Sequence, residues 1–503
     1  MIENIRKTSL INKVNRDNIR LVCIFSIFFC FVILNCFYTL SYLIDSLEHI
    51  QASWLVSIGK IPYRVFFEHH NPLIWYLLAP IVKFLEYNFS VVYICRIIAV
   101  LGYFSCFLIL YHIISKHLAN KQIALYTMLY IMLLPLGTVI IDIRPDIFML
   151  MCQLLSLNYL YNYLDSKRRK DLIVSYVMIS FSFLFLQKSL FFIFCFGLGS
   201  LYLLYKKSLK FKDCLIAGSV ALIPLLVFAI YLYVTDSWKE YCFYNYPFNL
   251  QLIKYYGNVN YYTNNFDVWL FISFLVFIRL CPKDDKYIFL AVIVFGQVIS
   301  LINFAPYSHY YVPCLLFCAV TMGYCLQKLV SFKSYMLYVI YAAILFFSAS
   351  GLLKNSSQYS TELFEYIKYS IQPQNKVLNL GNGCIYCQPV GYYWFGFGNV
   401  VVIDDVFNFR NINLNQIISS QKADYIYIYK GRNHIYDNQN RFNILLNKMI
   451  IKAAVNSKKS EEYISKIKEV EFDYWNIDYD ELTRYYVKVK ELTDREIWKS
   501  KNI

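Results

Sequence analysis

The chain has 503 residues, of which 58% are hydrophobic and 16% charged, and its formal net charge is +15. Soluble proteins carry about 25% charged residues and their cores stop growing at roughly 250–300 residues, so the composition excludes an ordinary soluble protein. The positive charge does not indicate a nucleic-acid partner, because the basic residues lie in short loops between apolar segments, where they report membrane topology.

Eleven apolar segments approach the length of about 20 residues that a helix needs to cross a bilayer. The first of them is too long for the apolar core of a cleavable signal peptide, which spans about 7–15 residues. The predicted fold class is therefore a polytopic α-helical membrane protein with about eleven transmembrane helices. The expected spans are 21–41, 88–111, 122–141, 147–164, 172–187, 189–205, 214–234, 267–281, 287–304, 312–327 and 335–352.

The segment 42–87, between the first two expected spans, mixes apolar residues with charged residues and histidines. Such a mixture is typical of helices that lie along a membrane surface rather than across it. We therefore expect interfacial helices here, within a transmembrane domain over 1–352.

Lysine and arginine are concentrated in every second loop, which sets the orientation of the chain. With eleven spans, all of these loops fall on one side, so we expect a cytoplasmic N-terminus and an extracytoplasmic tail. The basic groups are Arg6–Arg20, Lys116 and Lys121, Lys167–Lys170, Lys206–Lys212, Lys283 and Lys286, and Lys328 and Lys333.

The tail, 353–503, differs in character from the rest of the chain. Short apolar stretches beginning at Lys376, Val400 and Ala423 are typical of strands, and helical patterns at 360–370 and 411–420 lie among them. We expect a small extracytoplasmic α/β domain with a charge-rich, helical tail after about residue 441.

The tail also holds the CxxC pair of the chain, Cys384 and Cys387. A disulfide, half of a metal site and two free thiols all fit this spacing.

Asp45 is expected where the first span leaves the membrane on the outer face. In a helix, Glu48 and His49 would share its face, at the i+3 and i+4 positions. This group could take a proton from an attacking hydroxyl; alternatively, Asp45 caps the next helix and Glu48 completes a capping box.

The next outer-face motif runs from Glu68 to Tyr76 and contains His69, His70 and Pro72. Imidazoles in such a loop could bind phosphate or coordinate a metal. We interpret His69 as an ordinary interfacial histidine and keep His70 as a candidate ligand.

Three further cations are candidates. Arg144 and Asp146 flank a proline suited to a first helical turn; Arg144 could grip a phosphate through two hydrogen bonds, or the two residues could form a surface salt bridge and cap. Lys188, between two apolar runs, could contact phosphate or snorkel to the interface. For Arg96, inside a span, we expect a structural partner.

His309, Tyr310 and Tyr311 enter the tenth span between two prolines. They could line a lipid or sugar pocket, or form one more interfacial aromatic belt.

The order of these motifs resembles the GT-C superfamily of polyprenyl-phosphate-dependent glycosyltransferases, over roughly residues 20–350. It is most similar to the bacterial relatives of protein O-mannosyltransferases and of the lipid A aminoarabinose transferase. The motifs that carry the resemblance are Asp45 with Gly59-Lys-Ile-Pro-Tyr63, Asn71-Pro72-Leu73, Arg144-Pro145-Asp146, Lys188 and His309-Tyr310-Tyr311.

The resemblance implies an enzyme of the bacterial inner (plasma) membrane that transfers a sugar from a polyprenyl-phosphate donor to a hydroxyl of a glycan, lipid or protein acceptor, with inversion at the anomeric carbon. Asp45 would be the general base, with Glu48 beside it. The donor phosphate would be held by His70, Arg144 and Lys188, and the substrate pocket lined by His49, Asp146, His309, Tyr310 and Tyr311.

The chain departs from the family pattern at two places. Asp45 is followed by Ser46 where the family often has a second acid, and His70-Asn71 stand where it often has proline or lysine. Relatives differ in metal dependence, so a divalent metal near Asp45 stays open.

Two other classes compete with this interpretation. A transporter or flippase would show internal repeats and polar, broken helices at the bilayer midplane, whereas the polar candidates here gather at one interface. A polysaccharide polymerase or ligase would centre on one long outer loop, and the longest one here, 235–267, holds few charges.

Overall fold

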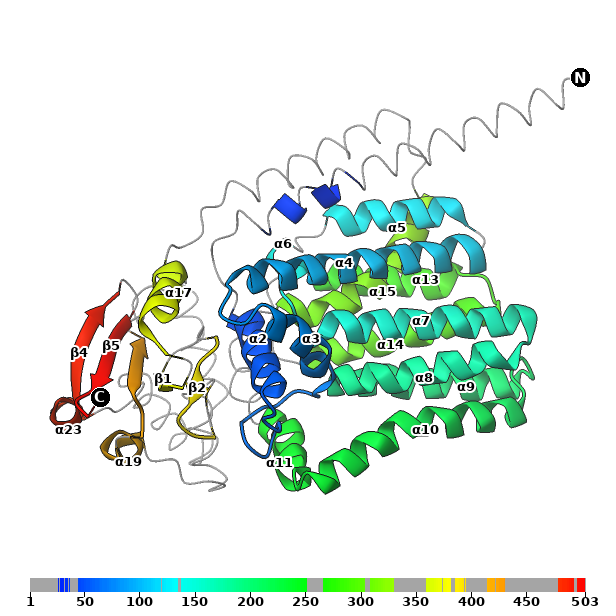
Figure 1. The fold of residues 1–503 in the computed structure, drawn as a ribbon. Coiled ribbons are helices and arrows are strands. Elements are labelled where there is room, and N and C mark those ends of the chain that lie inside the picture. Colours follow the sequence, from blue (N-terminus) through cyan, green and yellow to red (C-terminus); the bar gives the residue numbers. More distant parts are fainter. Residues whose placement is uncertain are drawn as a thin grey trace, which may run out of the picture.

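The computed structural model is mainly helical, with a mixed sheet near the C-terminus (Figure 1). The residues that it describes are 44–118, 120–133, 137–250, 266–303, 308–329, 359–372, 374–380, 385–392, 394, 414–420, 422–429, 478–492 and 495–502, with part of 26–36.

The helical part consists mainly of long helices lying side by side, connected in places by short helical segments. Two helices, α2 (Ile44–Ser57) and α3 (Leu73–Phe84), lie at one end of them. The others are α4 (Ser90–His112), η1 (Ile113–His117), α5 (Lys121–Leu133), α6 (Gly137–Ile140), α7 (Pro145–Ser166), α8 (Arg169–Phe185), η2 (Gln187–Ser189), α9 (Leu190–Tyr205), α10 (Phe211–Val234), α11 (Trp238–Phe243), η3 (Tyr244–Phe248), α13 (Phe266–Leu280), α14 (Asp285–Asn303) and α15 (Ser308–Leu329).

The expected spans agree with these helices wherever the structure describes them. The expected span 335–352 lies outside the described residues and 21–41 is described only in part, while the other expected spans each fall on helical residues. The segment 42–87 contains two short helices, α2 and α3; that they lie along the membrane surface stays a prediction.

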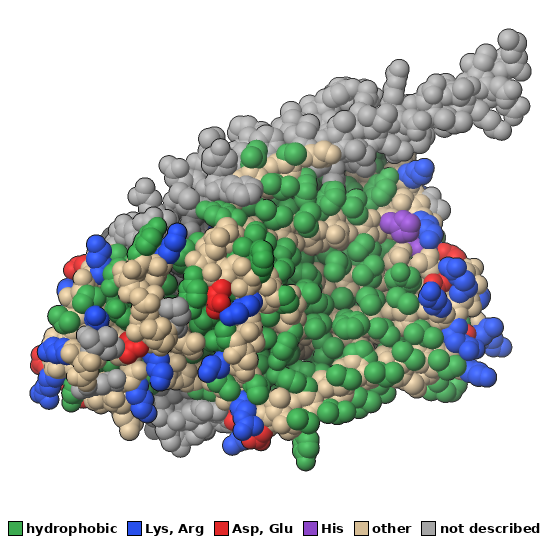
Figure 2. Space-filling model, viewed as in Figure 1, with side chains coloured by type: hydrophobic (Ala, Val, Ile, Leu, Met, Phe, Trp, Pro, Cys, Tyr) green, Lys and Arg blue, Asp and Glu red, His purple; other side chains and the backbone are tan. Residues whose placement is uncertain are grey.

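Among the described residues, three helical segments are long and apolar enough to cross a membrane: Ser90–His117, Gln187–Tyr205 and Phe211–Val234. Large apolar side chains are exposed along them, and Figure 2 shows a broad apolar surface over this part of the molecule. The polytopic helical class is therefore supported, and the count of eleven spans stays a prediction.

The basic loops that the structure describes lie together at the end of the helices opposite α2 and α3 (Figure 2). Asp165 pairs with Lys286 and, at 2.9 Å, with His117 Nδ1. Lys167 Nζ donates to the Ser208 carbonyl at 2.9 Å. Loops predicted to share one membrane side are thus bonded to one another; that this side is cytoplasmic stays a prediction.

One close contact between helices depends on a glycine. A Cβ at Gly323 of α15 would lie 2.2 Å from Thr127 Oγ1 and 2.9 Å from the Ile123 carbonyl oxygen of α5. Only a residue without a side chain lets the two backbones approach so closely, as is common between membrane helices.

The C-terminal sheet has five strands in the order β2-β1-β3-β5-β4. β1 pairs in parallel with β2 and β3, and β5 pairs antiparallel with β3 and β4. The strands are β1 (Lys376–Leu380), β2 (Gln388–Pro389), β3 (Tyr425–Tyr429), β4 (Tyr486–Glu491) and β5 (Arg495–Ser500), and the associated helices are α17 (Tyr359–Ser370), α19 (Leu414–Ser419) and α23 (Tyr479–Tyr485).

The strands expected at Lys376 and Ala423 and the helices near 360–370 and 411–420 match β1, β3, α17 and α19. The strand expected at Val400 lies outside the described residues. That this part is a separate extracytoplasmic domain stays a prediction.

The expectation of a helical tail is wrong for residues 486–500, which form the β4–β5 hairpin. β4 reads Tyr-Val-Lys-Val-Lys-Glu, whose alternation has the period of a strand, and β5 buries Ile497 and Trp498. The lysines and the glutamate of β4 lie on an edge strand, where lysines are common.

A segment of the tail, residues 385–394, packs against α2 and the loop that follows it. The Gln51 amide donates to the Cys387 carbonyl at 2.6 Å, and Trp394 Nε1 donates to the Phe67 carbonyl at 2.9 Å. The Tyr392 hydroxyl donates to the Tyr63 carbonyl at 2.6 Å. Cys387 is disulfide-bonded.

Candidate active site

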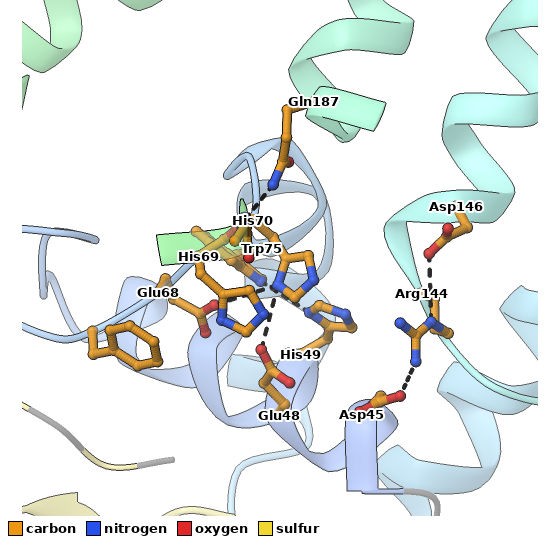
Figure 3. A network of polar contacts seen from close by, with 12 residues as sticks. Asp45, Glu48, His49, Glu68, His69, His70, Trp75, Arg144, Asp146 and Gln187 are labelled. Atoms are coloured by element: carbon orange, nitrogen blue, oxygen red, sulfur yellow. Dashed lines mark hydrogen bonds and ion pairs between the residues drawn. The ribbon is translucent and has the colours of Figure 1, made fainter. Parts of the chain in front are cut away.

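The candidate site lies at the end of the helices that carries α2 and α3. Its side chains come from α2, from the loop between α2 and α3, from the turn before α7, and from η2 (Figure 3). α2 ends in a tight turn: Gly59 has φ +83°, and Lys60 N–H donates to the Leu55 carbonyl at 2.9 Å. Glycine is favoured in this left-handed position after a helix, and the turn leads the chain toward Glu68.

Arg144 is the centre of a buried ionic cluster. Its guanidinium pairs with Asp45 of α2, lies 3.6 Å from Asp142, and donates through Nε to Asp146 Oδ2 at 3.4 Å. The Arg144 side chain is only 4% exposed. The interpretation of Arg144 and Asp146 as a surface salt bridge is therefore excluded.

Asp146 is shared by two cations. While its Oδ2 faces Arg144, its Oδ1 lies 3.7 Å from Lys188 Nζ. Pro145 occupies the first turn of α7, as its sequence position predicts. The fold thus brings Lys188, in η2 between α8 and α9, and Arg144, just before α7, to the same carboxylate.

Ser46 fixes the turn that carries Arg144. Its hydroxyl donates to Asp142 and accepts a hydrogen bond from Ile143 N–H at 3.1 Å. Burial raises the pKa of Asp142 to about 7, although the Ser46 hydrogen bond opposes this shift. The charge of Asp142 therefore changes near neutral pH.

Glu48, Glu68, His69 and His70 form a second group beside the first (Figure 3). His70 Nδ1 lies 3.4 Å from Glu48 Oε1 and 3.9 Å from Glu68 Oε2. Burial raises the pKa of Glu48 to about 7, and burial together with the neighbouring Glu48 raises the pKa of Glu68 well above its usual value.

His49 lies next to this group on α2. Its Nδ1 accepts a hydrogen bond from Trp75 Nε1 of α3 at 3.2 Å, and its ring packs edge-on against His70. Burial lowers the pKa of His49 to about 4 and that of His70 to about 3. Both imidazoles are therefore neutral at physiological pH.

The loop that carries Glu68–Asn71 is held from several sides. The His69 carbonyl accepts hydrogen bonds from Gln187 and Asn249, both at 2.9 Å. The Asn71 side chain donates to the Phe183 carbonyl and accepts from the Tyr241 hydroxyl at 3.1 Å. These contacts join the loop to η2, α8 and α11.

The structure brings most of the predicted site residues together: Asp45, Glu48, His49, His70, Arg144, Asp146 and Lys188 lie in the two adjoining groups. His309, Tyr310 and Tyr311 are in the first turns of α15, but their side chains lie outside the described residues. Arg96 donates to the Cys36 carbonyl at 2.9 Å, the structural role expected of it.

The alternative roles of Asp45 and Glu48 as helix caps do not match their contacts. Asp45 lies in the first turn of α2 and pairs with Arg144, while Glu48 faces His70. Of these two acids, Asp45 is the accessible one, with 37% of its side chain exposed against 3% for Glu48.

Sequence reasoning assigned no role to Glu68 and Asp142, and it interpreted His69 as an ordinary interfacial histidine. Glu68 and His69 were visible as a Glu-His-His run, whose three consecutive ligand-type side chains are a signal for coordination. Asp142 gave no such signal, because only the folded turn brings it to Ser46 and Arg144.

Part of the chain matches a known protein family. Residues 69–233 match the PMT_2 family, described as dolichyl-phosphate-mannose-protein mannosyltransferase. No curated protein sequence matches the chain.

Solved structures with a similar fold include ArnT from Cupriavidus metallidurans bound to undecaprenyl phosphate, with 9% identity and a TM-score of 0.61 over 95% of this chain and 97% of ArnT. They also include the archaeal oligosaccharyltransferase AglB from Archaeoglobus fulgidus, in complex with an inhibitory peptide and a dolichol-phosphate, with 8% identity and a TM-score of 0.50 over 85% of this chain and 71% of AglB. The predicted resemblance is confirmed: the chain is similar to the GT-C superfamily of polyprenyl-phosphate-dependent glycosyltransferases in the sequence of residues 69–233 and has their fold.

Proposed function

We propose that this protein is a membrane glycosyltransferase that moves a sugar from a polyprenyl-phosphate donor to an acceptor hydroxyl, with inversion at the anomeric carbon. The site would open on the outer face of a bacterial plasma (inner) membrane. The acceptor is a hydroxyl of a glycan, a lipid or a protein.

One observation carries this proposal: Arg144 and Lys188 converge on Asp146 beside the accessible carboxylate of Asp45. Two cations next to each other suit a phosphate diester, and arginine can bind it through two parallel hydrogen bonds. A carboxylate beside a bound leaving group is where an attacking hydroxyl needs a base.

The names of the similar proteins support the class of donor. The ArnT structure contains undecaprenyl phosphate and the AglB structure contains a dolichol-phosphate. The matched family is named for dolichyl-phosphate-mannose. A polyprenyl phosphate carrying the sugar is therefore the donor that we assign to Arg144 and Lys188.

Donor binding would release the base. Asp45 pairs with Arg144, so a phosphate that takes up the guanidinium would displace the Asp45 carboxylate toward solvent. The enzyme would thus expose its base only when the leaving group is in place.

The chemical step then needs no covalent intermediate. Asp45 accepts the proton of the acceptor hydroxyl while that oxygen bonds to the anomeric carbon. The bond between this carbon and the phosphate oxygen breaks, and its electron pair stays on the phosphate. Arg144 and Lys188 stabilise the negative charge that develops on the phosphate. One well-placed hydrogen-bond donor of this kind raises the rate by about 10²–10³.

The test is reconstitution of the purified protein in liposomes with a polyprenyl-phosphate sugar labelled in the sugar. We expect label on envelope acceptors, one equivalent of polyprenyl phosphate released, and an inverted anomeric configuration in the product by NMR. Label that crosses the bilayer without leaving its lipid would instead identify a flippase, and growth of one long glycan a polymerase.

A further inference from the structure

Four side chains with metal-binding atoms converge next to the proposed catalytic residues. Glu48 comes from α2, and Glu68, His69 and His70 come from the loop before α3. One ligand atom of each lies within 4.8 Å of every other. The sequence brings three of them together by adjacency, and the fold adds Glu48.

The distances are close to those of a tetrahedral metal site. Bonds of about 2.0–2.1 Å to a central Zn²⁺ place neighbouring ligand atoms about 3.3 Å apart. His70 Nδ1 is 3.4 Å from Glu48 Oε1 and 3.9 Å from Glu68 Oε2. Small movements of side chains would complete this geometry.

Polar atoms of these four side chains are buried and lack other partners. Among the described residues, no hydrogen-bond partner of normal geometry exists for Glu48 Oε1, for either carboxylate oxygen of Glu68, or for Nδ1 of His69 and His70. Glu48 and Glu68 are 3% and 1% exposed. Buried polar atoms are normally bonded, and two buried carboxylates repel each other unless a cation or a proton lies between them.

We propose that Glu48, Glu68, His69 and His70 bind one divalent transition-metal cation of the zinc class. Imidazole nitrogen with carboxylate oxygen suits Zn²⁺, whereas Mg²⁺ and Ca²⁺ prefer all-oxygen sites. The cation would neutralise the two carboxylates and tie α2, which carries Asp45, to the loop before α3. His70 then serves the metal, and the donor phosphate is left to Arg144 and Lys188.

This site goes beyond the proposed function and is tested without any sugar transfer. The full-length protein, freed of any histidine tag and held in lipid nanodiscs, is stripped with a chelator, loaded with ZnCl₂ and desalted. Bound metal is counted by mass spectrometry, and its ligands are determined by X-ray absorption. We expect one zinc per chain, two imidazole ligands, and no displacement by excess MgCl₂.

Glu68→Gln and Glu48→Gln keep the shape of the side chain but weaken the ligand. Each should reduce zinc affinity by more than the roughly 10–100-fold that loss of an outer-shell partner costs. His117→Gln is the matched control, because His117 is a buried histidine that pairs with Asp165 at the opposite end of the helices. It should bind zinc as the wild type does.

Melting temperature supplies a second readout. Zinc should raise it in the wild type and in His117→Gln but not in Glu68→Gln. A wild type that retains no zinc would overturn the proposal, as would unchanged affinity in both glutamine variants. If the variants fail to fold, a wild-type absorption spectrum without two imidazoles would overturn it as well.

Discussion

Asp45 and Arg144 form an ion pair across 99 residues of sequence, joining the first turn of α2 to the turn before α7. The pair joins Asp45, the accessible acid of the site, to Arg144, which is more deeply buried than Lys188. In the proposed reaction the two residues act on different partners, Asp45 on the acceptor and Arg144 on the donor, so the pair must separate on donor binding.

A substitution of Arg144 that keeps its positive charge should weaken binding of the sugar donor while leaving the stability of the protein nearly unchanged. Arg144→Lys retains a cation for the three neighbouring carboxylates but loses the paired hydrogen bonds to phosphate. We expect kcat/KM to fall by about 10²–10³ with little change in melting temperature. Arg144→Gln should in addition lower the free energy of unfolding by about 3–5 kcal/mol, because it leaves buried carboxylates without a partner.

The affinity for the donor should depend on pH through Asp142. Its pKa is raised to about 7, chiefly by burial, so it is neutral below that pH and charged above it. Once charged, it competes with the donor phosphate for Arg144, and affinity should therefore fall as pH rises through about 7.

Asp142→Asn should abolish this fall, because the amide stays neutral at every pH. Affinity should be measured with a phosphodiester donor, since a free polyprenyl phosphate monoester itself titrates near pH 6. An equally steep pH dependence in Asp142→Asn would assign the titration to another group.

The segment 385–394 should support the site through its contacts with the loop before α3. Trp394→Phe removes the hydrogen bond to the Phe67 carbonyl, next to Glu68, and should cost about 1 kcal/mol of stability and lower the transfer rate. Trp498→Phe is the control, since Trp498 Nε1 bonds to Glu496 within β5. Equal transfer rates in the two variants would show that the 385–394 contact has no influence on the site.

The close approach of α5 and α15 should make Gly323 sensitive to substitution. Gly323→Ala places a methyl group against Thr127 and the Ile123 carbonyl, and overpacking of this kind costs about 1–3 kcal/mol. Gly218→Ala in α10 has nothing within 4 Å of the new methyl and should be neutral or slightly stabilising. Thermal unfolding in detergent measures both; equal melting temperatures would contradict the packing argument.

The helices were predictable because each apolar segment is long and bounded by charged loops. The expected span at 88–111 and the helix α4 at Ser90–His112 nearly coincide, and the loop around Lys188 ends α8 as expected. The β4–β5 hairpin was missed because its lysines and glutamates hide an alternation of only a few residues, and because its pairing partner, β3, lies far away in the sequence.

Part of the site was predictable because a residue's chemistry conflicts with its surroundings. Arg144 and Lys188 stood out as cations at the ends of apolar helices, and both lie in the site. The closeness of Glu48 to Glu68 could not be predicted from the sequence, because it depends on the path that the chain takes after Gly59 back toward α2.

The most direct measurement compares wild type with Asp45→Asn, in both sugar transfer and donor binding. Because the amide cannot accept the proton, transfer should fall by about 10²–10⁴, the usual contribution of a general base. Donor affinity should be unchanged or higher, because Arg144 loses a competing carboxylate. Transfer at the wild-type rate by a folded Asp45→Asn protein would contradict the account.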